Sequence, residues 1–411
     1  MMIGWGDGMG DGRSVRHALL AATALASVAA AAPQGLHAET AGAPIALRLG
    51  GEFYGAFSIA DQSSGAGPDG IVGTIDDAPG QNRRNNGFLR VSRVFFSGDT
   101  KLDNGLDVGV LVKLNAEDCL DQIDEAYIWF ESRFGRFEYG ATNGVADKMV
   151  IGSANPVAHL GLNTPDLLPA NPTNSSGVGN LAATPVTTVD TATLERVNYF
   201  TPQIHGLRLG LSYVPVQCVE GNSGTTPCGG SYAGMPAGNV AQGYDFLQGA
   251  ATYERPLGPV DLGLYAAYTR ADTGSGVVAV PGAAGTGAQR QWGVGGSLGY
   301  QGFAVGGGYR RSLDDAFTAD LNVTDWNASL HYATGPWSGG IQYASKEARL
   351  LARTDSFDGV SAGAAYQLGP GISLFGAAQY YDWSTNAAAA AIRSAATNEA
   401  WTLSLGAGLA F

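Results

Sequence analysis

Charged side chains that could line a narrow aqueous path are spaced along the chain. The candidates are four residues in segments where apolar and polar residues alternate, and two acids in a long stretch without alternation: Arg48, Lys113, Arg196 and Glu125, then Asp147 and Asp166. Opposite charges that face each other across a constricted path create a strong local field, which orients dipolar solutes. Each residue could instead be an ordinary solvated charge, and the sequence leaves both interpretations open.

Histidine is the commonest base in nucleophilic catalysis, and here its placement gives little support for an enzyme. Two of the five histidines, His17 and His37, lie in an N-terminal segment that we expect to be removed. No nucleophile motif accompanies His159, His205 or His331. We therefore predict that the protein is not an enzyme.

Cysteines and loop acids offer a possible disulfide and a possible cation site. Cys218 and Cys228 share a loop rich in Gly, Ser and Pro, so a disulfide between them and two free thiols are both open in an oxidising compartment. Asp69, Asp76 and Asp77 carry the oxygen ligands that Ca²⁺ prefers, but they follow no fixed ligand spacing. A hydrated acidic loop is the alternative, so we expect no cofactor and leave a structural Ca²⁺ open.

Composition and the N-terminus indicate export to a membrane. The 411 residues include 61 Gly and only 14% charged residues. After the N-terminus no stretch of about 18 apolar residues predicts a helical span. An apolar run at 18–32 and the small residue Ala38 predict a signal peptide at 1–38, followed by one domain at 39–411. The net charge of −13, without a basic stripe, argues against nucleic acid as a partner.

Alternation with a period of two residues predicts strands that have one apolar and one polar face. In the last such segment, Leu403 and Leu405 alternate with Ser404 and Gly406. The predicted strands are 45–60, 87–100, 106–116, 122–132, 135–142, 193–201, 206–215, 242–255, 260–271, 289–301, 303–312, 322–334, 337–348, 356–367, 372–383 and 399–411. Sixteen is an even number, as a closed up-and-down barrel requires. We therefore predict an all-β fold, a 16-stranded antiparallel transmembrane β-barrel.

The connections between the predicted strands alternate in length. Tight turns of Gly, Pro and Asn, such as 103–105 and 335–336, are expected on the periplasmic side. The connection 143–192, between the fifth and sixth strands, is long and has no periodicity, which is unusual unless a loop is functional or disordered. We predict that it folds inward and narrows the hole. Its part 150–172 is largely apolar, and either packs against the wall or makes the constriction less polar.

Short motifs follow one another in a specific order after the N-terminus. They are Ser92-Arg93-Val94-Phe95-Phe96-Ser97-Gly98-Asp99, Asp124-Glu125-Ala126-Tyr127, Phe134-Gly135-Arg136-Phe137-Glu138-Tyr139-Gly140 and Val197-Asn198-Tyr199-Phe200-Thr201-Pro202. In order and spacing, the chain resembles the general porins of Gram-negative outer membranes, especially those of alphaproteobacteria. The resemblance implies passive diffusion of small hydrophilic solutes and ions, usually through a homotrimer whose third long loop lies in the lumen.

The resemblance also implies roles for two residues. Arg93 matches the wall arginine that faces acids on the inward loop, and Phe411 matches the family's C-terminal assembly signal. As further partners we expect outer-membrane lipid, lipopolysaccharide and the outer-membrane assembly machinery. Two other functions of the same fold stay open, namely a substrate-specific channel and a structural or surface-interaction barrel with a plugged pore.

Overall fold

The computed structural model describes residues 45–63, 84–116, 122–163, 166–170, 193–216, 243–273, 287–314, 321–350, 353–385 and 397–411. The strands in these ranges are β1 (Ala46–Gln62), β2 (Asn86–Lys101), β3 (Asp107–Asn115), β4 (Ile123–Ser132), β5 (Gly135–Thr142), β6 (Leu194–Phe200), β7 (Leu207–Val216), β8 (Gly243–Leu257), β9 (Val260–Thr273), β10 (Gly287–Tyr300), β11 (Phe303–Asp314), β12 (Leu321–Thr334), β13 (Trp337–Leu350), β14 (Arg353–Gly369), β15 (Ile372–Thr385) and β16 (Thr397–Ala410). A single helical turn, α2 (Val145–Lys148), follows β5.

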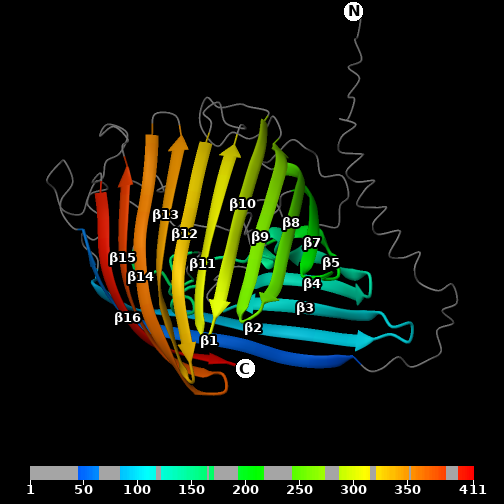
Figure 1. Cartoon of the computed structure of the whole chain (residues 1–411), viewed down its shortest axis with the longest axis horizontal. Helices are drawn as coiled ribbons and strands as arrows, with labels where there is room; N and C mark the ends of the chain where they lie inside the picture. Colours follow the sequence, from blue (N-terminus) through cyan, green and yellow to red (C-terminus); the bar gives the residue numbers. More distant parts are fainter. Residues whose placement is uncertain are drawn as a thin grey trace, which may run out of the picture.

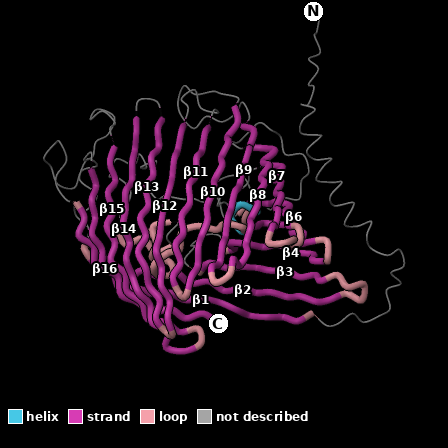
Figure 2. The backbone as a smooth tube through the Cα atoms, viewed as in Figure 1, coloured by secondary structure: helices cyan, strands magenta, loops and turns pink. Residues whose placement is uncertain are grey.

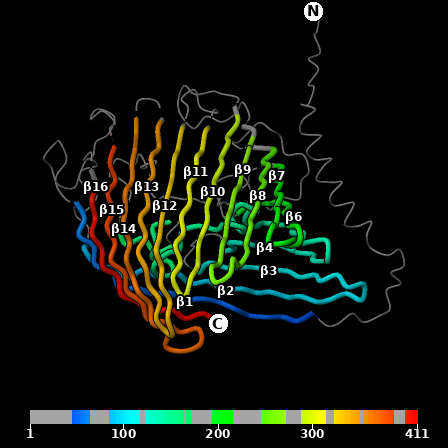
Figure 3. The backbone as a smooth tube through the Cα atoms, in the orientation of Figure 1, coloured from blue at the N-terminus to red at the C-terminus, as the bar shows by residue number. Residues whose placement is uncertain are grey.

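The strands form a closed barrel in which each pairs with its neighbours in the chain (Figure 1). The barrel closes where β1 pairs with β16, and Figure 3 shows this seam with β1 in blue beside β16 in red. Closure leaves no strand edge with unpaired amides, which would be costly in a bilayer. The predicted 16-stranded antiparallel barrel is confirmed. No helix among the described residues is long and apolar enough to cross a membrane.

Alternating residue types give the wall its two faces. On β16, Leu403 and Leu405 point outward and are 51% and 62% exposed, whereas Ser404 between them is buried. Aromatic pairs lie on the outer face, among them Trp292 and Tyr309, whose ring centroids are 5.2 Å apart. The apolar outer face suits lipid, and the polar face surrounds the lumen.

Tight turns join strands at one end of the barrel (Figure 2). In the turn between β10 and β11, Gly302 has a φ of 86°, which a residue with a side chain rarely adopts. A Cβ at Gly302 would also lie only 2.5 Å from the backbone oxygen of Ala333. The opposite end, where β1 ends and β2 begins, carries the longer connections and is called the long-loop end below.

Some predicted features lie outside the described residues, and they stay predictions. They are the signal peptide 1–38, the Cys218–Cys228 disulfide, the acids Asp69, Asp76 and Asp77, and the second part of the long connection, 171–192.

Candidate functional site

The long connection after β5 begins against the inner wall of the barrel. We call its described residues, 143–163 and 166–170, the inner loop. Val145 and Ala146 of α2 are fully buried. The Ala146 amide donates to Gln248 Oε1 of β8 at 2.8 Å, and the Tyr265 hydroxyl of β9 donates to the Ala146 carbonyl at 2.6 Å. Because Gln248 and Tyr265 lie on the buried, inward face of their strands, the inner loop starts inside the barrel.

Glycines on the inward faces of several strands allow the inner loop to approach the wall. A Cβ on Gly210 of β7 or on Gly363 of β14 would lie 2.5 or 2.6 Å from side chains of the inner loop. On β10 and β11, a Cβ on Gly295 or Gly306 would overlap backbone oxygens of the inner loop. We call these four residues the glycine track. Any side chain there would displace the loop, so glycine is required by close approach rather than by turn geometry.

Polar side chains of the wall bind the backbone of the loop's middle. Gln342 of β13 accepts a hydrogen bond from the Leu162 amide at 2.7 Å and donates to Ser153 Oγ at 2.9 Å. Gln379 of β15 donates to the Leu160 carbonyl at 2.7 Å. Buried backbone groups need such partners, and here side chains of the strands supply them.

Leucines of the inner loop fill the space between it and the wall. Leu160, Leu162 and Leu167 are 0%, 1% and 2% exposed. Leu162 belongs to a buried cluster with Phe357 of β14 and Trp383 of β15, both of which lie on the inward face of the wall. Of the two interpretations left open for the apolar stretch, the structure therefore supports packing against the wall for its described part.

Arg93, on the inward face of β2, binds the far end of the inner loop. Its Nη2 lies 2.8 Å from Asp166 Oδ1, and its Nη1 lies 2.9 Å from Glu52 Oε1 on β1. His159 Nδ1 lies 2.6 Å from Asp166 Oδ2, and the His159 ring is 4.4 Å from the ring of Tyr54. The structure thus brings together two predicted residues, Arg93 and Asp166. It does so as an ion pair in contact, and not as charges that face each other across an open gap.

The surroundings of Asp166 favour its ionised form. Burial alone would raise the pKa of this carboxyl. Hydrogen bonds from His159 and from Arg93 outweigh burial and lower the pKa from its ordinary 3.8 to about 2. The contact between Arg93 and Asp166 is therefore a contact between two charged groups at neutral pH.

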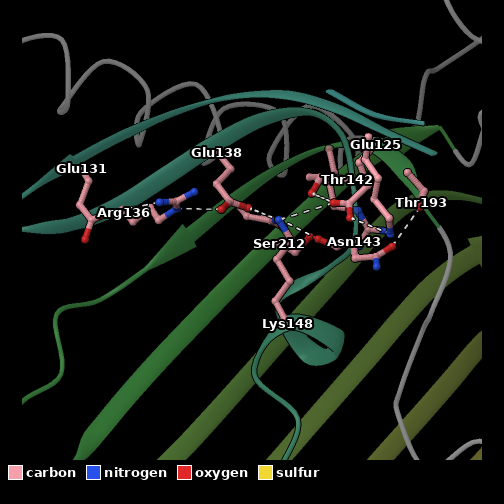
Figure 4. A network of polar contacts seen from close by, with 12 residues as sticks. Glu125, Glu131, Arg136, Glu138, Thr142, Asn143, Lys148, Thr193 and Ser212 are labelled. Carbon is pink, nitrogen blue, oxygen red and sulfur yellow. Dashed lines mark hydrogen bonds and ion pairs between the residues drawn. The ribbon is translucent and has the colours of Figure 1, made fainter. Parts of the chain in front are cut away.

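A second group of charges surrounds Lys148, which points from α2 toward the wall (Figure 4). Lys148 Nζ lies 2.7 Å from Glu138 Oε2 on β5 and 3.9 Å from Glu125 Oε2 on β4. Arg136 Nε donates to Glu138 Oε1 at 2.8 Å. The Glu138 side chain is only 4% exposed, so its charge is balanced by two basic groups where water is scarce.

Three of the predicted residues belong to this second group or lie next to it. Glu125 accepts a hydrogen bond from the Thr142 hydroxyl at 2.8 Å. Lys113 Nζ lies 2.5 Å from Asp124 Oδ2 and 3.8 Å from Glu125 Oε1. Asp147 lies in α2, one residue before Lys148. These residues surround the start of the inner loop, and the Arg93 contact lies at its far end.

Arg48 lies apart from both groups of charges, whereas Arg196 lies against the start of the inner loop, since a Cβ on Gly144 would overlap Arg196 Nη1. Arg48 pairs with Asp99 of β2 and keeps 62% of its side chain exposed. Arg196 of β6 is 1% exposed, and its Nη1 lies 3.5 Å from Ser212 Oγ. Arg196 is thus a buried wall residue, whereas Arg48 is a solvated charge.

Several residues that hold the inner loop were missed from the sequence. Glu52 binds Arg93, and Lys148 binds Glu138. Three glutamines of the wall bind the backbone of the inner loop: Gln248, Gln342 and Gln379. A signal existed for the glutamines, because each lies on the polar parity of an otherwise Gly- and Ala-rich strand. No such signal points to Lys148, which lies in an aperiodic stretch.

Solved structures of bacterial outer-membrane proteins have a similar fold. The anion-selective porin from Comamonas acidovorans is 13% identical, with a TM-score of 0.56 over 90% of this chain and 100% of that chain. OmpT of Vibrio cholerae in its trimer form is 10% identical, with a TM-score of 0.57 over 90% and 100%. The outer membrane channel DcaP of Acinetobacter baumannii is 11% identical, with a TM-score of 0.55 over 89% and 97%. At these identities the likeness shows the fold alone. No curated protein sequence matches the chain.

The family itself is shown by a match in sequence. A family model described as Gram-negative porin matches residues 18–386, which is well over half of the chain. The closed barrel, with its apolar outer face and polar inner face, is the architecture that such a channel needs. The chain therefore belongs to the Gram-negative porin family and forms an outer-membrane channel for small solutes.

Proposed function

We propose that the channel passes small hydrophilic solutes and ions by passive diffusion through water, and that the inner loop narrows it. The contact between Arg93 and Asp166 carries this proposal. It ties the far end of the inner loop to β2, after the loop has followed the wall from Gly210 of β7 to Gln379 of β15. A segment held along that much of the wall reduces the free cross-section, so solute size is the first limit to passage.

Charge selectivity is expected to be weak. Inward-facing charges lie in close pairs of opposite sign, as Arg93 does with Asp166 and Lys148 does with Glu138. A passing ion then meets fields that largely cancel, because the two charges of a pair are only 2.7 to 2.8 Å apart.

A homotrimer is part of the proposal. OmpT of Vibrio cholerae, which has a similar fold, is described in a trimer form. The outer faces of β1 and β2 carry large exposed apolar side chains, among them Leu47 at 83% and Phe88 at 86%, and such a face needs lipid or another subunit to cover it. Phe411 follows β16 and is 67% exposed, which suits the proposed assembly signal.

The proposal includes neither catalysis nor a cofactor. Diffusion through water changes no bond. The histidine of the inner loop, His159, contacts the carboxylates of Asp166 and Glu52, which supports a role as an anchor rather than as a base. Within the described ranges, no group of three or more His, Cys, Asp or Glu could hold a metal ion. A structural Ca²⁺ in the first long loop stays a prediction.

Single-channel recording of the folded protein in planar bilayers, under a KCl gradient, tests the proposal. We expect stepwise openings in threes, a small reversal potential and exclusion of large polymers. The variant Arg93→Gln should conduct more than the wild type, because the far end of the inner loop is released.

Two outcomes would favour the alternative functions. If folded trimers give no openings, the inner loop closes the pore and the protein is a structural barrel. If conductance saturates and one sugar or acid blocks it, the protein is a substrate-specific channel.

A further inference from the structure

Two bands of aromatic side chains bound the apolar part of the outer wall. On β12 the bands are represented by Trp326 and Tyr332, which are 43% and 41% exposed. Trp326 packs against Tyr343 of β13 with ring centroids 5.0 Å apart, and Tyr332 packs against Phe303 of β11 at 4.3 Å. Aromatic side chains of this kind mark the boundaries between hydrocarbon and headgroups. The spacing of the two bands therefore measures the hydrocarbon thickness that the wall fits.

The two bands lie close together on three neighbouring strands, β11, β12 and β13 (Figure 1). Only two outward residues separate them on each strand: Val305 and Gly307 on β11, Ala328 and Leu330 on β12, and Gly339 and Ile341 on β13. The six residues from Trp326 to Tyr332 span about 20 Å of strand. At a strand tilt of about 35–45° this is about 14–16 Å along the membrane normal, whereas the apolar band of such barrels is about 25 Å tall.

Polar outward residues begin directly beyond the band on the side of the long-loop end. They are Thr324 on β12 and then Ser345 and Glu347 on β13. Glu347 pairs with Arg349 at 2.7 Å, and the two side chains are 45% and 62% exposed. A hydrocarbon layer of ordinary thickness takes about ten residues of tilted strand, so from Trp337 it would reach Glu347. Such a layer would surround these polar groups with acyl chains, which is costly.

Other strands carry a taller apolar band. On β10, three outward residues separate Trp292 from Tyr300: Val294, Gly296 and Leu298. On β16, four outward residues lie between Trp401 and Phe411, and this distance of ten residues matches an ordinary hydrocarbon layer. The height of the band therefore differs between one part of the wall and another.

We propose that the outer face of β11–β13 thins the bilayer beside it. The partner of this face is lipid whose acyl chains are short or disordered, and the layer beside β10 stays thicker. An apolar stretch that is shorter than the hydrocarbon layer is met by thinning of the bilayer. Thinning keeps Thr324, Ser345 and Glu347 at the level of the headgroups. The inference depends on placement in the outer membrane and does not depend on conduction.

Electron cryomicroscopy of the protein in nanodiscs tests the proposal, with phosphatidylcholine that carries oleoyl chains as the lipid. The two headgroup layers around the barrel can then be measured beside each part of the wall. We expect them to lie about 5 Å closer together beside β11–β13 than beside β10, because the band is two residues shorter there. Equal separation around the barrel would overturn the proposal.

A double variant tests whether the height of the band causes the thinning. Thr324→Leu/Ser345→Leu extends the apolar band by one outward position on β12 and on β13. The headgroup layers beside these strands should move apart by about 5 Å. The matched control is Thr324→Ser/Ser345→Thr, which keeps both positions polar and should thin the bilayer as the wild type does. Both positions face outward, so every variant should keep the wild-type conductance, which shows that the barrel is folded.

Insertion into vesicles gives a second readout. In a series of phosphatidylcholines of increasing acyl-chain length, the wild type should insert most completely at a shorter chain length than the double leucine variant. An identical optimum for the two proteins would refute the match between band and bilayer. Density of a second copy of the chain against β11–β13 in the nanodiscs would also overturn the proposal, because protein and not thinned lipid would then cover this face.

Discussion

The two ends of the inner loop are held by contacts of different character. At the start, Lys148 binds Glu138, which is ten residues away in the chain and only 4% exposed. At the far end, Asp166 binds Arg93, which is 73 residues away, and the Asp166 side chain is 35% exposed. Between them the glycine track holds the loop by shape rather than by charge.

Under the proposed function, we expect one of these contacts to determine mainly stability and the other mainly the width of the pore. The contact between Lys148 and Glu138, called the near contact below, lies close to where the chain leaves β5. Its loss leaves the buried Glu138 with one fewer basic partner but leaves the path of the loop defined. We propose that the position of the loop in the lumen depends on the glycine track and on the contact between Arg93 and Asp166, called the far contact below. Variants of these regions should therefore differ in whether they change conductance, unfolding or both.

The largest expected effect comes from the glycine track. Gly295→Ala places a Cβ against the backbone oxygen of Ile151, so the middle of the inner loop must leave the wall. Overpacking of this kind costs about 1–3 kcal/mol of unfolding free energy. We expect the largest change in single-channel conductance of the variants discussed here, together with a lower thermal unfolding temperature.

The same strand offers the control for this variant. Gly299→Ala adds a Cβ on the inward face of β10 at 3.5 Å from the nearest atom of Asp261, which is ordinary contact. It should leave conductance and unfolding unchanged. Equal effects of the two variants would contradict the role of the glycine track.

The far contact should give the next largest effect. Arg93→Gln and Asp166→Asn each release the end of the inner loop, so each should raise conductance and current noise. In a double-mutant cycle of thermal unfolding, the coupling between the two residues should be about 0.5–3 kcal/mol. Additive effects on unfolding, with unchanged conductance, would show that the ion pair does not hold the loop.

The near contact should change stability more than conductance. Lys148→Met leaves the buried Glu138 with Arg136 as its remaining basic partner, so unfolding free energy should fall by about 1–3 kcal/mol. Lys101→Met is the matched control, because Lys101 and Asp107 form an exposed pair whose loss should cost less than about 1 kcal/mol. If Lys148→Met conducts as Arg93→Gln does, the near contact also affects the width of the pore, and the expected difference between the two contacts is refuted.

The smallest expected effect is that of mild acid. The pKa of Asp166 is lowered from 3.8 to about 2, so its ion pair contributes fully above the ordinary pKa and is lost as pH falls through about 2. Conductance that depends on this contact should stay level from neutral to mildly acidic pH. It should rise only as the pH approaches about 2, the pKa of Asp166. In Asp166→Asn that rise should be absent. A rise between pH 5 and 6 in the wild type would point to a different group.

The strands and their faces could be predicted because alternation is a local property. Leu403 and Ser404 fall on opposite faces by their spacing alone, and the same rule assigns Lys113 to the inner face. Sixteen segments and their alternating connections then led to a closed barrel. The contact of Arg93 with an acid of the inner loop was expected from the resemblance, although as opposed charges and not as a touching pair.

The path of the inner loop could not be predicted, because it depends on contacts between distant segments. Spacing gives the face of Gly295 or Gln342 but not which loop residue passes over it. The sequence suggests His159 only as a candidate base, and it reveals neither the contact of His159 with Asp166 nor its φ of 64°.

The inner loop also crosses the seam of the barrel on the inside. Leu160 and Leu167 belong to one cluster with Ala56 of β1 and Phe375 of β15. The seam pairs residues from opposite ends of the sequence, such as Glu52 with Ala410, and pairing of such distant segments is slow because the intervening chain must be ordered first. Since the inner loop contacts both sides of the seam, we expect it to bring them together before β1 and β16 pair. The inner loop would then act as an internal template for closing the barrel, and we expect replacement of its leucines to change the rate of folding as well as the width of the pore.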